Sequence, residues 1–573
     1  MKIINLSEGN CRSCYKCLNS CGVKAIKMVN EQAEIVDERC IACGHCVVVC
    51  PQGARKFVND VEQIKTAIKK GKTVIASVAP SFPGAFNLKY SGQIVKALKM
   101  LGFSIVEETS IGAEVVTTVY KDYLQSGKYD NFITTSCPSV NYLIEKYYPD
   151  LIKYMAPAVS PMIAHGKILK KKYGEESYVV FIGPCVSKKA ESKEKKYDNI
   201  INAVITFNEL SEWFTEENIA IGNLESQEFD RVSGEVSSEF PLLGGIIKNI
   251  SNNCDLKLDA VNVDGIEECK EIFKSISDGK LTNVLVEANV CKGGCIGGPS
   301  MVKSKSGYYE RQKKVREYVR SKKKIIHDES LTLNKKDYYT VFENRQVVRK
   351  TANEEEIKKI LESVGKYSKD DELNCGGCGY NTCRDKAQAV YEGMSEAYIC
   401  LPYLRSKAES MKNVIFENSP NLIAVVDENL NMLEINPKAE QTFKISSAQS
   451  KGQPVSNFVD ESYFATVKEN EKGDTMSFKI AANSNDIILL SSIKYLPKEK
   501  VFIAIMTDVT LEEKNRQKLD FVKEQTFDAA EEVIKKQMRV AQEIAGLLGE
   551  TTGETKVILT KLKNLYGKEK RNL

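Results

Sequence analysis

The sequence lacks any segment suited to a membrane. No apolar run approaches the roughly 20 residues that a membrane-spanning helix needs, and the opening MKIINLSEGNCRSC lacks the apolar stretch of a signal peptide. A large excess of either charge is missing too, because the formal net charge is +4 over 573 residues. We therefore expect a cytoplasmic protein with neither a nucleic-acid nor a membrane partner, long enough for about three to five domains.

The C-terminal part lacks the residues that several sensor functions require. Neither histidine nor cysteine follows Cys400, which excludes histidine-ligated haem and a cysteinyl flavin adduct there. The same region has no phospho-accepting histidine and no nucleotide-binding glycine loop. It cannot act as a histidine kinase, and any signal that it carries must pass through a partner.

Cysteine, by contrast, is abundant, with 18 residues in the chain. Cytosolic thiols stay reduced, so this number favours metal binding over disulfides. All of them except Cys254 and Cys269 fall into recognisable patterns, and the sequence assigns no role to these two.

Two cysteine runs near the N-terminus share one spacing. CRSCYKCLNSC and CIACGHCVVVCP both read C-x2-C-x2-C-x3-C, as in two-cluster bacterial ferredoxins, in which the fourth cysteine of each run binds the other cluster. We assign the first 4Fe-4S cluster to Cys11, Cys14, Cys17 and Cys50. The second takes Cys40, Cys43, Cys46 and Cys21. Paired zinc sites are the disfavoured alternative, because zinc motifs rarely carry two overlapping tetrads.

A third cysteine set lies in CGGCGYNTCRDKAQAVYEGMSEAYIC. It comprises Cys375, Cys378, Cys383 and Cys400. We expect the first three in a glycine-rich loop, where the backbone can approach sulfide closely, and the fourth after a helix. The pattern resembles the small 4Fe-4S domain found beside redox enzymes, with zinc as the alternative.

The four remaining cysteines each follow an apolar, strand-like run. These runs are NFITTSC, SYVVFIGPC and TNVLVEANVCKGGC, and they end at Cys137, Cys185, Cys291 and Cys295. Helical patterns such as YSGQIVKALKMLGF lie between them, which predicts βαβ units with parallel strands. Because ligands bind beyond the carboxyl ends of such strands, we expect the four thiols to converge.

The loops that carry these cysteines resemble a known family. TSCP, GPCVSKKAE and EANVCKGGCIGGP resemble, in order, the three H-cluster loops of FeFe hydrogenases, and SVAPS resembles the first active-site strand end of that family. The resemblance covers about residues 1–350. It implies that the four cysteines hold a 4Fe-4S cube and that Cys295 bridges it to a diiron subcluster carrying CO, cyanide and a dithiolate amine. It also implies cofactor contacts from Ala79, Pro80, Ser81 and Pro184.

The second loop carries a lysine and a glutamate that also fit this family. The resemblance places Lys188 where an ammonium donates to a cyanide of the distal iron, with Glu191 three residues on. A buried anionic cyanide is costly unless it is hydrogen-bonded, and a charge-assisted bond is a strong one. The alternative is a surface Lys/Glu pair at helical spacing.

The departures from the family concern proton transfer. Ser136 stands where other members have a cysteine that relays protons, and a hydroxyl is far less acidic than a thiol, whose pKa is about 8.5. Gly183 and Asn289 replace two methionines that pack against the diiron site, and Val119–Lys121 replaces an acidic pair. We expect Ser136 to take part in catalysis, at low turnover.

Five domains are predicted, in an α/β multidomain chain. They are an α+β two-cluster ferredoxin-like module (1–58), a two-lobed α/β H-cluster domain with parallel sheets (59–350), a small 4Fe-4S domain (355–410), an α+β PAS domain (411–512) and a C-terminal helical segment (513–573). The PAS prediction depends on a resemblance. NLIAVVDENLNMLEINPKAEQTF predicts a strand, a polar turn, a second strand ending at Asn436 and then a helix start, and VFIAIMTDVT is the closing strand.

Two helical segments have open interpretations. The basic stretch 303–324 is either a solvated face or a docking site for an acidic redox partner. The C-terminal segment has a heptad-like stripe, which either packs on the PAS domain or pairs with another helix. The stripe comprises Phe527, Ala530, Ile534, Met538, Ala541, Ala545 and Leu548.

Together these patterns predict a sensory FeFe hydrogenase that slowly interconverts H2 with protons and electrons. Its expected cofactors are three 4Fe-4S clusters and an H-cluster, and its expected partners are H2, a ferredoxin-type redox protein, a downstream signalling protein and a second copy of the chain. A metabolic, ferredoxin-linked hydrogenase is one alternative. A non-enzymatic protein of cluster assembly is the other, which Lys188 and Glu191 disfavour.

Overall fold

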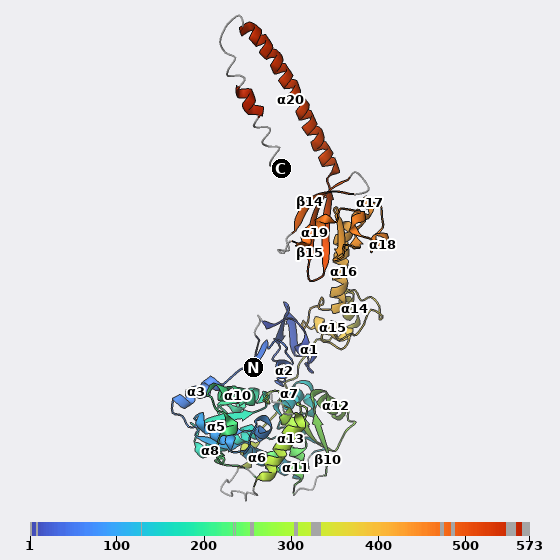
Figure 1. Ribbon diagram of the computed structural model, residues 1–573. Helices are drawn as coiled ribbons and strands as arrows, with labels where there is room; N and C mark the ends of the chain where they lie inside the picture. The colour runs from blue at the N-terminus through green and yellow to red at the C-terminus, as the bar shows by residue number, and fades with distance from the viewer. Residues whose placement is uncertain are drawn as a thin grey trace. The chain divides into compact units, whose positions relative to one another are not determined.

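The computed structural model describes residues 3–6, 10–127, 129–232, 234, 236–252, 257–302, 307–322, 334–469, 475–482, 487–545 and 557–563. Cys254, Leu548 and both ends of the basic stretch 303–324 lie outside these residues. The chain forms two compact units, residues 1–404 and 405–573, which are treated separately below (Figure 1).

The N-terminal module repeats one backbone conformation twice. Strand β1 (Ile4–Leu6) pairs with β4 (Arg55–Phe57), β2 (Ile26–Val29) pairs with β3 (Gln32–Ile35), and each cysteine run leads into a short helix, α1 (Lys16–Asn19) or α2 (His45–Val48). Equivalent positions of the two runs both have a positive φ, 54° at Tyr15 and 76° at Gly44. The repeat in the sequence is therefore a repeat in the fold.

The next domain is built on two parallel sheets. One has the strand order β6 (Ile105–Glu108), β5 (Val74–Val78), β8 (Tyr178–Gly183) and β9 (Ala203–Thr206); the other has β10 (Asp259–Asp264), β11 (Val284–Asn289) and β7 (Asn131–Ile133). All residues of β5 and β11 are buried, as is usual for strands covered on both faces. The predicted two-lobed domain with parallel sheets is confirmed.

Helices cover both sheets (Figure 1). They are α3 (Val61–Lys69), α4 (Phe82–Ala85), α5 (Gln93–Met100), α6 (Ser110–Gln125), α7 (Pro138–Tyr147), α8 (Pro161–Tyr173), α9 (Ser187–Glu191), α10 (Phe207–Glu216), α11 (Gly245–Ser251), α12 (Ile266–Ser277) and α13 (Tyr308–Ser321). The 3-10 helices are η2 (Pro149–Tyr154), η3 (Lys195–Tyr197), η4 (Ile221–Asn223), η5 (Val236–Glu239), η6 (Gly294–Gly297) and η7 (Lys335–Tyr338).

The small cysteine-containing segment has helices α14 (Glu354–Glu362) and α15 (Cys383–Tyr391) and packs on the N-terminal module. The Lys24 ammonium donates to the Gly379 carbonyl at 2.8 Å, and Leu18 belongs to the shared apolar core. One expectation is wrong: Cys383 does not lie in the loop but opens α15. The physical reason is a capping box, in which the Thr382 side chain accepts from the Asp385 backbone and Asp385 accepts from Thr382.

The second unit contains a five-stranded antiparallel sheet with the order β13-β12-β16-β15-β14. Its strands are β12 (Leu422–Asp427), β13 (Met432–Ile435), β14 (Met476–Ala481), β15 (Ile488–Leu496) and β16 (Val501–Asp508). Its helices are α16 (Leu401–Asn418, whose first residues belong to the first unit), α17 (Pro437–Phe443), α18 (Ser447–Ser450), α19 (Ser462–Glu469) and α20 (Thr510–Ala545), with the 3-10 helix η8 (Val455–Asn457). The Asn436 side chain caps α17, where the sequence predicts a helix start.

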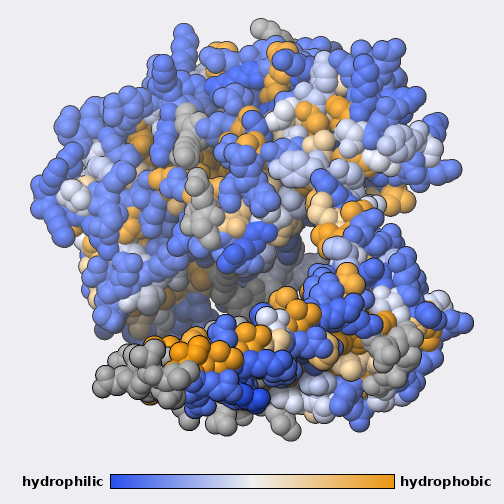
Figure 2. Space-filling view, turned by 90° about the horizontal axis from the view of Figure 1, so that it is seen from above, coloured by the Kyte–Doolittle hydropathy of each residue, from blue (hydrophilic) through white to orange (hydrophobic). Residues whose placement is uncertain are grey.

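Most apolar side chains of the long helix α20 are exposed in a single chain, whereas Ile534 and Met538 of the predicted stripe are partly buried. Leu519, Val533 and Ile544 are each exposed by more than half. None of the described helices combines the length and apolarity of a membrane span. On the face in Figure 2, hydrophobic residues lie in small groups between hydrophilic ones.

Candidate metal centre

Four cysteines from both sheets meet at one cavity of the parallel-sheet domain. Cys137 follows β7 and caps α7, Cys185 follows β8, and Cys291 and Cys295 follow β11. All four line the same cavity, together with the four residues predicted to contact a cofactor, namely Ala79, Pro80, Ser81 and Pro184. The structure thus places every one of these residues where the carboxyl ends of the strands converge.

Burial makes this cavity unfavourable for free thiolates. Burial, followed by the neighbouring Cys185 and Cys137 thiols, raises the pKa of Cys291 well above its usual value. The pKa of Cys295 is raised for the same reasons, although the Lys188 ammonium acts in the opposite direction. Because thiolates are the metal-binding form, bound iron would compensate the charges that burial disfavours.

The cavity wall also holds polar atoms that fit a bound group. The hydroxyls of Ser81 and Ser110 are buried and have no hydrogen-bond partner in the described part of the chain, and an unpaired buried hydroxyl costs about 1–3 kcal/mol. Among the described residues, no three His, Cys, Asp or Glu side chains stand close enough to share one ion. A cube takes one thiolate at each iron, so its ligands are spaced more widely than those of a single ion.

Lys188 and Glu191 form a buried pair at this cavity. The Lys188 ammonium lies 2.8 Å from Glu191 Oε2 and 3.3 Å from the Ser136 carbonyl, which accepts its second hydrogen bond. Burial raises the pKa of the Glu191 carboxyl, against the effect of Lys188. Ser160 donates to Glu191 at 3.0 Å. The alternative of a surface pair is wrong, because less than a tenth of each side chain is exposed.

The Ser136 hydroxyl has a partner that the sequence did not reveal. Tyr120 on α6 is completely buried, and its hydroxyl lies 3.1 Å from Ser136 Oγ. The Thr135 backbone donates to the same tyrosine at 2.9 Å. Tyr120 lies within Val119–Lys121, where the sequence suggested only the loss of an acidic pair. No local pattern could have linked residues 120 and 136.

A buried acid on β11 was also missed. Glu287 is fully buried, and the backbone N–H groups of Gly244 and Ile247 donate to its two oxygens, each at 2.9 Å. Burial raises the pKa of its carboxyl to about 7, against these hydrogen bonds. The only available signal was a charged residue inside the apolar run VLVEAN.

The four cysteines assigned to the second N-terminal cluster lie close to one another. Burial raises the pKa of Cys46, although the charge of Arg55 acts in the opposite direction. The neighbouring thiols that raise this pKa further are Cys43, Cys40 and Cys21. Cys43 in turn acts electrostatically on Cys291 of the cavity. The second N-terminal set therefore lies next to the four-cysteine cavity.

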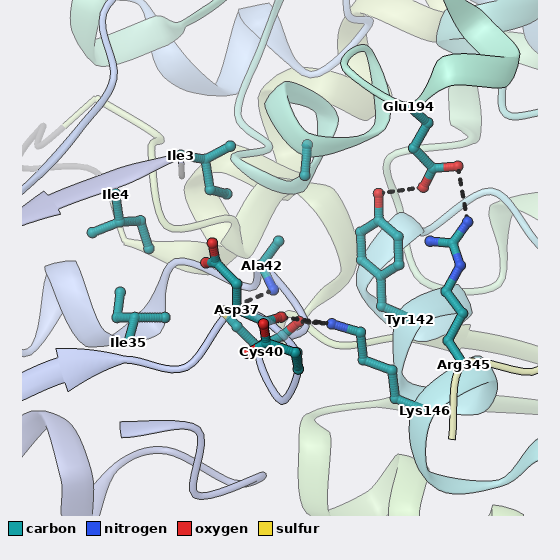
Figure 3. Close-up of a pocket in the computed structure, with 12 residues that line it drawn as sticks. Ile3, Ile4, Ile35, Asp37, Cys40, Ala42, Tyr142, Lys146, Glu194 and Arg345 are labelled. Atoms are coloured by element: carbon teal, nitrogen blue, oxygen red, sulfur yellow. Dashed lines mark hydrogen bonds and ion pairs between the residues drawn. The ribbon is translucent and has the colours of Figure 1, made fainter. Parts of the chain in front are cut away.

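A pocket between this module and α7 shows how the two are held together (Figure 3). The Lys146 ammonium donates to the Cys40 carbonyl at 2.6 Å. Tyr142 donates to Glu194 at 2.6 Å, and Arg345 lies 3.6 Å from the same carboxylate. Helix α7 thus follows Cys137 at one end and reaches the second cysteine set near the other.

The third set shares one pocket as well, lined by Cys375, Cys378, Cys383 and Cys400. The ammonium of Lys386 is buried beside it, and burial lowers its pKa to about 8, against the Cys378 and Cys400 thiols. A buried cation fits a site that gathers negative thiolates.

Known proteins resemble separate parts of the chain. Residues 72–299 match the iron-only hydrogenase large subunit, C-terminal domain; residues 3–51 match a 4Fe-4S dicluster domain; residues 371–402 match a putative Fe-S cluster segment; and residues 410–474 match the PAS fold.

Several relatives are hydrogenases, and others are named for cluster assembly. Iron hydrogenase 1 of Clostridium pasteurianum is 26% identical over 52% of this chain and 64% of its own length. The NADP-reducing hydrogenase subunit HndD of Solidesulfovibrio fructosivorans is 25% identical over 50% and 62%. The cytosolic Fe-S cluster assembly factor NAR1 of Vanderwaltozyma polyspora is 27% identical over 33% of this chain and 38% of its own length. The chain thus spans just under two thirds of the first two relatives.

Solved structures resemble the chain in part. An FeFe hydrogenase of Chlamydomonas reinhardtii aligns over 51% of this chain and all of its own, with 18% identity and a TM-score of 0.41. The family matches give the domain content: the chain carries the C-terminal domain of the iron-only hydrogenase large subunit, a 4Fe-4S dicluster domain and a PAS domain.

Proposed function

We propose that the protein is a sensory FeFe hydrogenase, which binds H2, interconverts it slowly with protons and electrons, and reports the result through its PAS domain. The observation that carries this proposal is the buried Lys188 ammonium at a cavity lined by four cysteines from two sheets. A plain cube also attracts a cation through its thiolates, as Lys386 beside the third cysteine set illustrates. An anionic ligand such as cyanide adds the need for a buried hydrogen-bond donor, which Lys188 supplies in this proposal.

In this proposal Cys137, Cys185, Cys291 and Cys295 hold the H-cluster, and Cys295 bridges its two parts. When bound, the H-cluster supplies an iron site at which H2 is cleaved into two protons and two electrons. Lys188 binds an anionic ligand of that site, and Glu191 fixes the lysine at 2.8 Å. The unpaired Ser81 hydroxyl donates a further hydrogen bond into the cavity.

Electrons leave through the N-terminal module. Cys43 lies within electrostatic range of Cys291, so a cluster held by the second N-terminal set would be the first acceptor. The first N-terminal cluster follows within the same repeat, and the cluster of residues 375–400 packs on that module through a shared apolar core. A ferredoxin-type protein is the alternative acceptor.

The output is proposed to run through the PAS domain and α20 to a signalling protein in the cytoplasm. Helix α16 starts directly after Cys400 and leads into the PAS sheet, so it joins the last cluster to the sensor domain along the chain. The exposed apolar residues of α20 suit pairing with a second copy, and we propose a homodimer.

Cluster assembly without hydrogenase activity is the second candidate, because relatives such as NAR1 are named for it. Infrared spectroscopy of protein matured with the diiron group separates the two. The hydrogenase proposal expects CO and cyanide bands that disappear in Cys295→Ala and persist in Cys269→Ala, which changes a buried cysteine outside the set. A matured sample that holds only cube-type clusters would favour the assembly function.

A further inference from the structure

A line of hydrogen bonds leaves the cavity at Thr109 and does not involve Ser136. Thr109 lines the cavity, and its hydroxyl lies 2.8 Å from the hydroxyl of Ser77. The Ser77 hydroxyl also makes a hydrogen bond of 2.8 Å with Nδ1 of His165. All three side chains are buried.

The same line continues from His165 to the surface. Nε2 of His165 lies 3.2 Å from one oxygen of Glu107. The other oxygen accepts from the Tyr173 hydroxyl at 2.6 Å and from the Lys172 ammonium at 3.3 Å. The Lys172 side chain is 39% exposed, so the line reaches solvent. No link in it exceeds 3.3 Å.

The fold holds this line together from elements distant in sequence. Ser77 on β5 and Glu107 on β6 are register partners in the parallel sheet. His165 lies on α8, which packs closely on α6 because Gly112 has no side chain: a Cβ there would come within 2.1 Å of the Pro161 carbonyl. Close packing of the two helices brings the imidazole against the strand ends.

The stability of the fold alone does not explain why this line of hydrogen-bonded side chains is buried. A buried ion pair is often no more stable than apolar residues of the same volume, since desolvation offsets the attraction. Burial opposes the ionised form of Glu107, yet the hydrogen bond and charge of His165, then Tyr173 and Lys172, bring the pKa of that carboxyl down to about 2. The carboxylate therefore stays ionised near neutral pH, and a proton from solvent occupies it only in transit to the imidazole beside it.

Each intermediate group can both accept and donate a proton. Hydroxyls have one donor and two acceptor positions, and an imidazole can take a proton on one nitrogen while it releases one from the other. This is the property that a proton relay requires and that a purely structural hydrogen bond does not.

We propose that Thr109, Ser77, His165 and Glu107 form a proton path between the metal-centre cavity and the surface at Lys172 and Tyr173. The proposal builds on the hydrogenase function proposed above. For proton uptake, Glu107 passes a proton from solvent to Nε2 of His165. Nδ1 releases its proton to Ser77 Oγ, Ser77 passes its own to Thr109 Oγ1, and Thr109 releases one into the cavity. One proton enters and one leaves, and hydrogen oxidation runs the path backwards.

The path can be tested without turnover, through exchange of the His165 ring N–H with solvent. The chain has three histidines, so 15N-histidine NMR of the full chain with its clusters oxidised gives few signals to assign. We expect the buried His165 N–H to exchange rapidly, and at least tenfold more slowly in Glu107→Gln. A ring N–H protected equally in both proteins would overturn the path, whatever the catalytic function.

Turnover of the matured protein gives the second test. Ser77→Ala should lower the rate of H2 conversion at least tenfold and raise its solvent deuterium isotope effect, with CO and cyanide bands unchanged. Ser77→Thr restores a hydroxyl and should recover most of the rate. At the surface end, Lys172→Ala should slow turnover more than Lys171→Ala, which changes an exposed neighbour. Equal rates and isotope effects in Ser77→Ala and the parent would contradict the path, while missing bands in the parent would contradict the hydrogenase function instead.

Discussion

The two units of the chain use their polar and apolar residues in opposite ways. In the first unit, charged side chains such as Lys188, Glu191 and Glu287 are buried around a cavity. In the second, apolar side chains of α20 such as Val533 and Ile544 are more than half exposed. The first arrangement suits chemistry inside the protein, whereas the second suits binding to another helix. The difference supports the proposed division, with catalysis in the first unit and output in the second.

The largest expected effect comes from removing the buried charge. Lys188→Ala leaves Glu191 buried without its partner, a change that costs about 3–5 kcal/mol in comparable pairs. We expect H2 turnover to fall more than a hundredfold, with altered cyanide bands in the infrared spectrum. Lys193→Ala, at an exposed position just after the same helix, is the control. Equal turnover in Lys188→Ala and the control would remove the main support for the hydrogenase proposal.

The acid on β11 should make the first unit less stable in alkali. The folded-state pKa of Glu287, about 7, lies above its ordinary value of about 4.3. Its contribution to stability is therefore complete below the ordinary value and is lost as pH rises through 7. The free energy of unfolding of the first unit should fall by about 3 kcal/mol between pH 4 and 9 in the parent. The Glu287→Gln variant should not show this loss. The same pH slope in both proteins would show that Glu287 is ionised without penalty.

Charged substitutions in α20 should weaken dimerisation of the second unit and leave H2 turnover unchanged. Phe527→Glu and Ile534→Glu place charges in the heptad-like stripe of α20, and we expect at least tenfold weaker self-association by analytical ultracentrifugation. Lys535→Glu changes charge at an exposed position that is not apolar and serves as the control. If both apolar variants associate like the parent, α20 is not the dimer contact.

The smallest effect is expected at Ser136. A thiol has a pKa near 8.5 and transfers protons more readily than a hydroxyl, so Ser136→Cys should raise turnover several-fold. The gain is partial because the acidic residues of the usual path are missing from Val119–Lys121. Ser136→Ala provides the comparison. Indistinguishable rates in the Cys and Ala variants would take residue 136 off the proton route.

The sequence predicted those parts of the site that depend on spacing along the chain. The ferredoxin repeats, the strand runs before Cys137 and Cys185, and the helix start after Asn436 all leave local patterns. The neighbours of Ser136 and Ser77 leave none. Tyr120 and His165 reach those hydroxyls only because helices α6 and α8 pack on the sheet, and such packing has no period in the sequence.

The burial of Lys188 could not be decided from the sequence for a related reason. A lysine three residues before a glutamate is equally typical of an exposed helix and of a buried ion pair. Only the position of α9 beneath the cavity distinguishes the two cases.

Hydrogen exchange of the PAS domain and α20, compared between oxidised and H2-reduced protein, tests the division between a catalytic and an output unit most directly. Reduction adds negative charge to the cluster of residues 375–400, from which α16 leads into the PAS sheet. The account predicts that H2 changes the exchange rates of the second unit in the parent and leaves them unchanged in Cys383→Ala. Identical exchange in the oxidised and reduced parent would contradict it and favour a metabolic hydrogenase with a passive PAS domain.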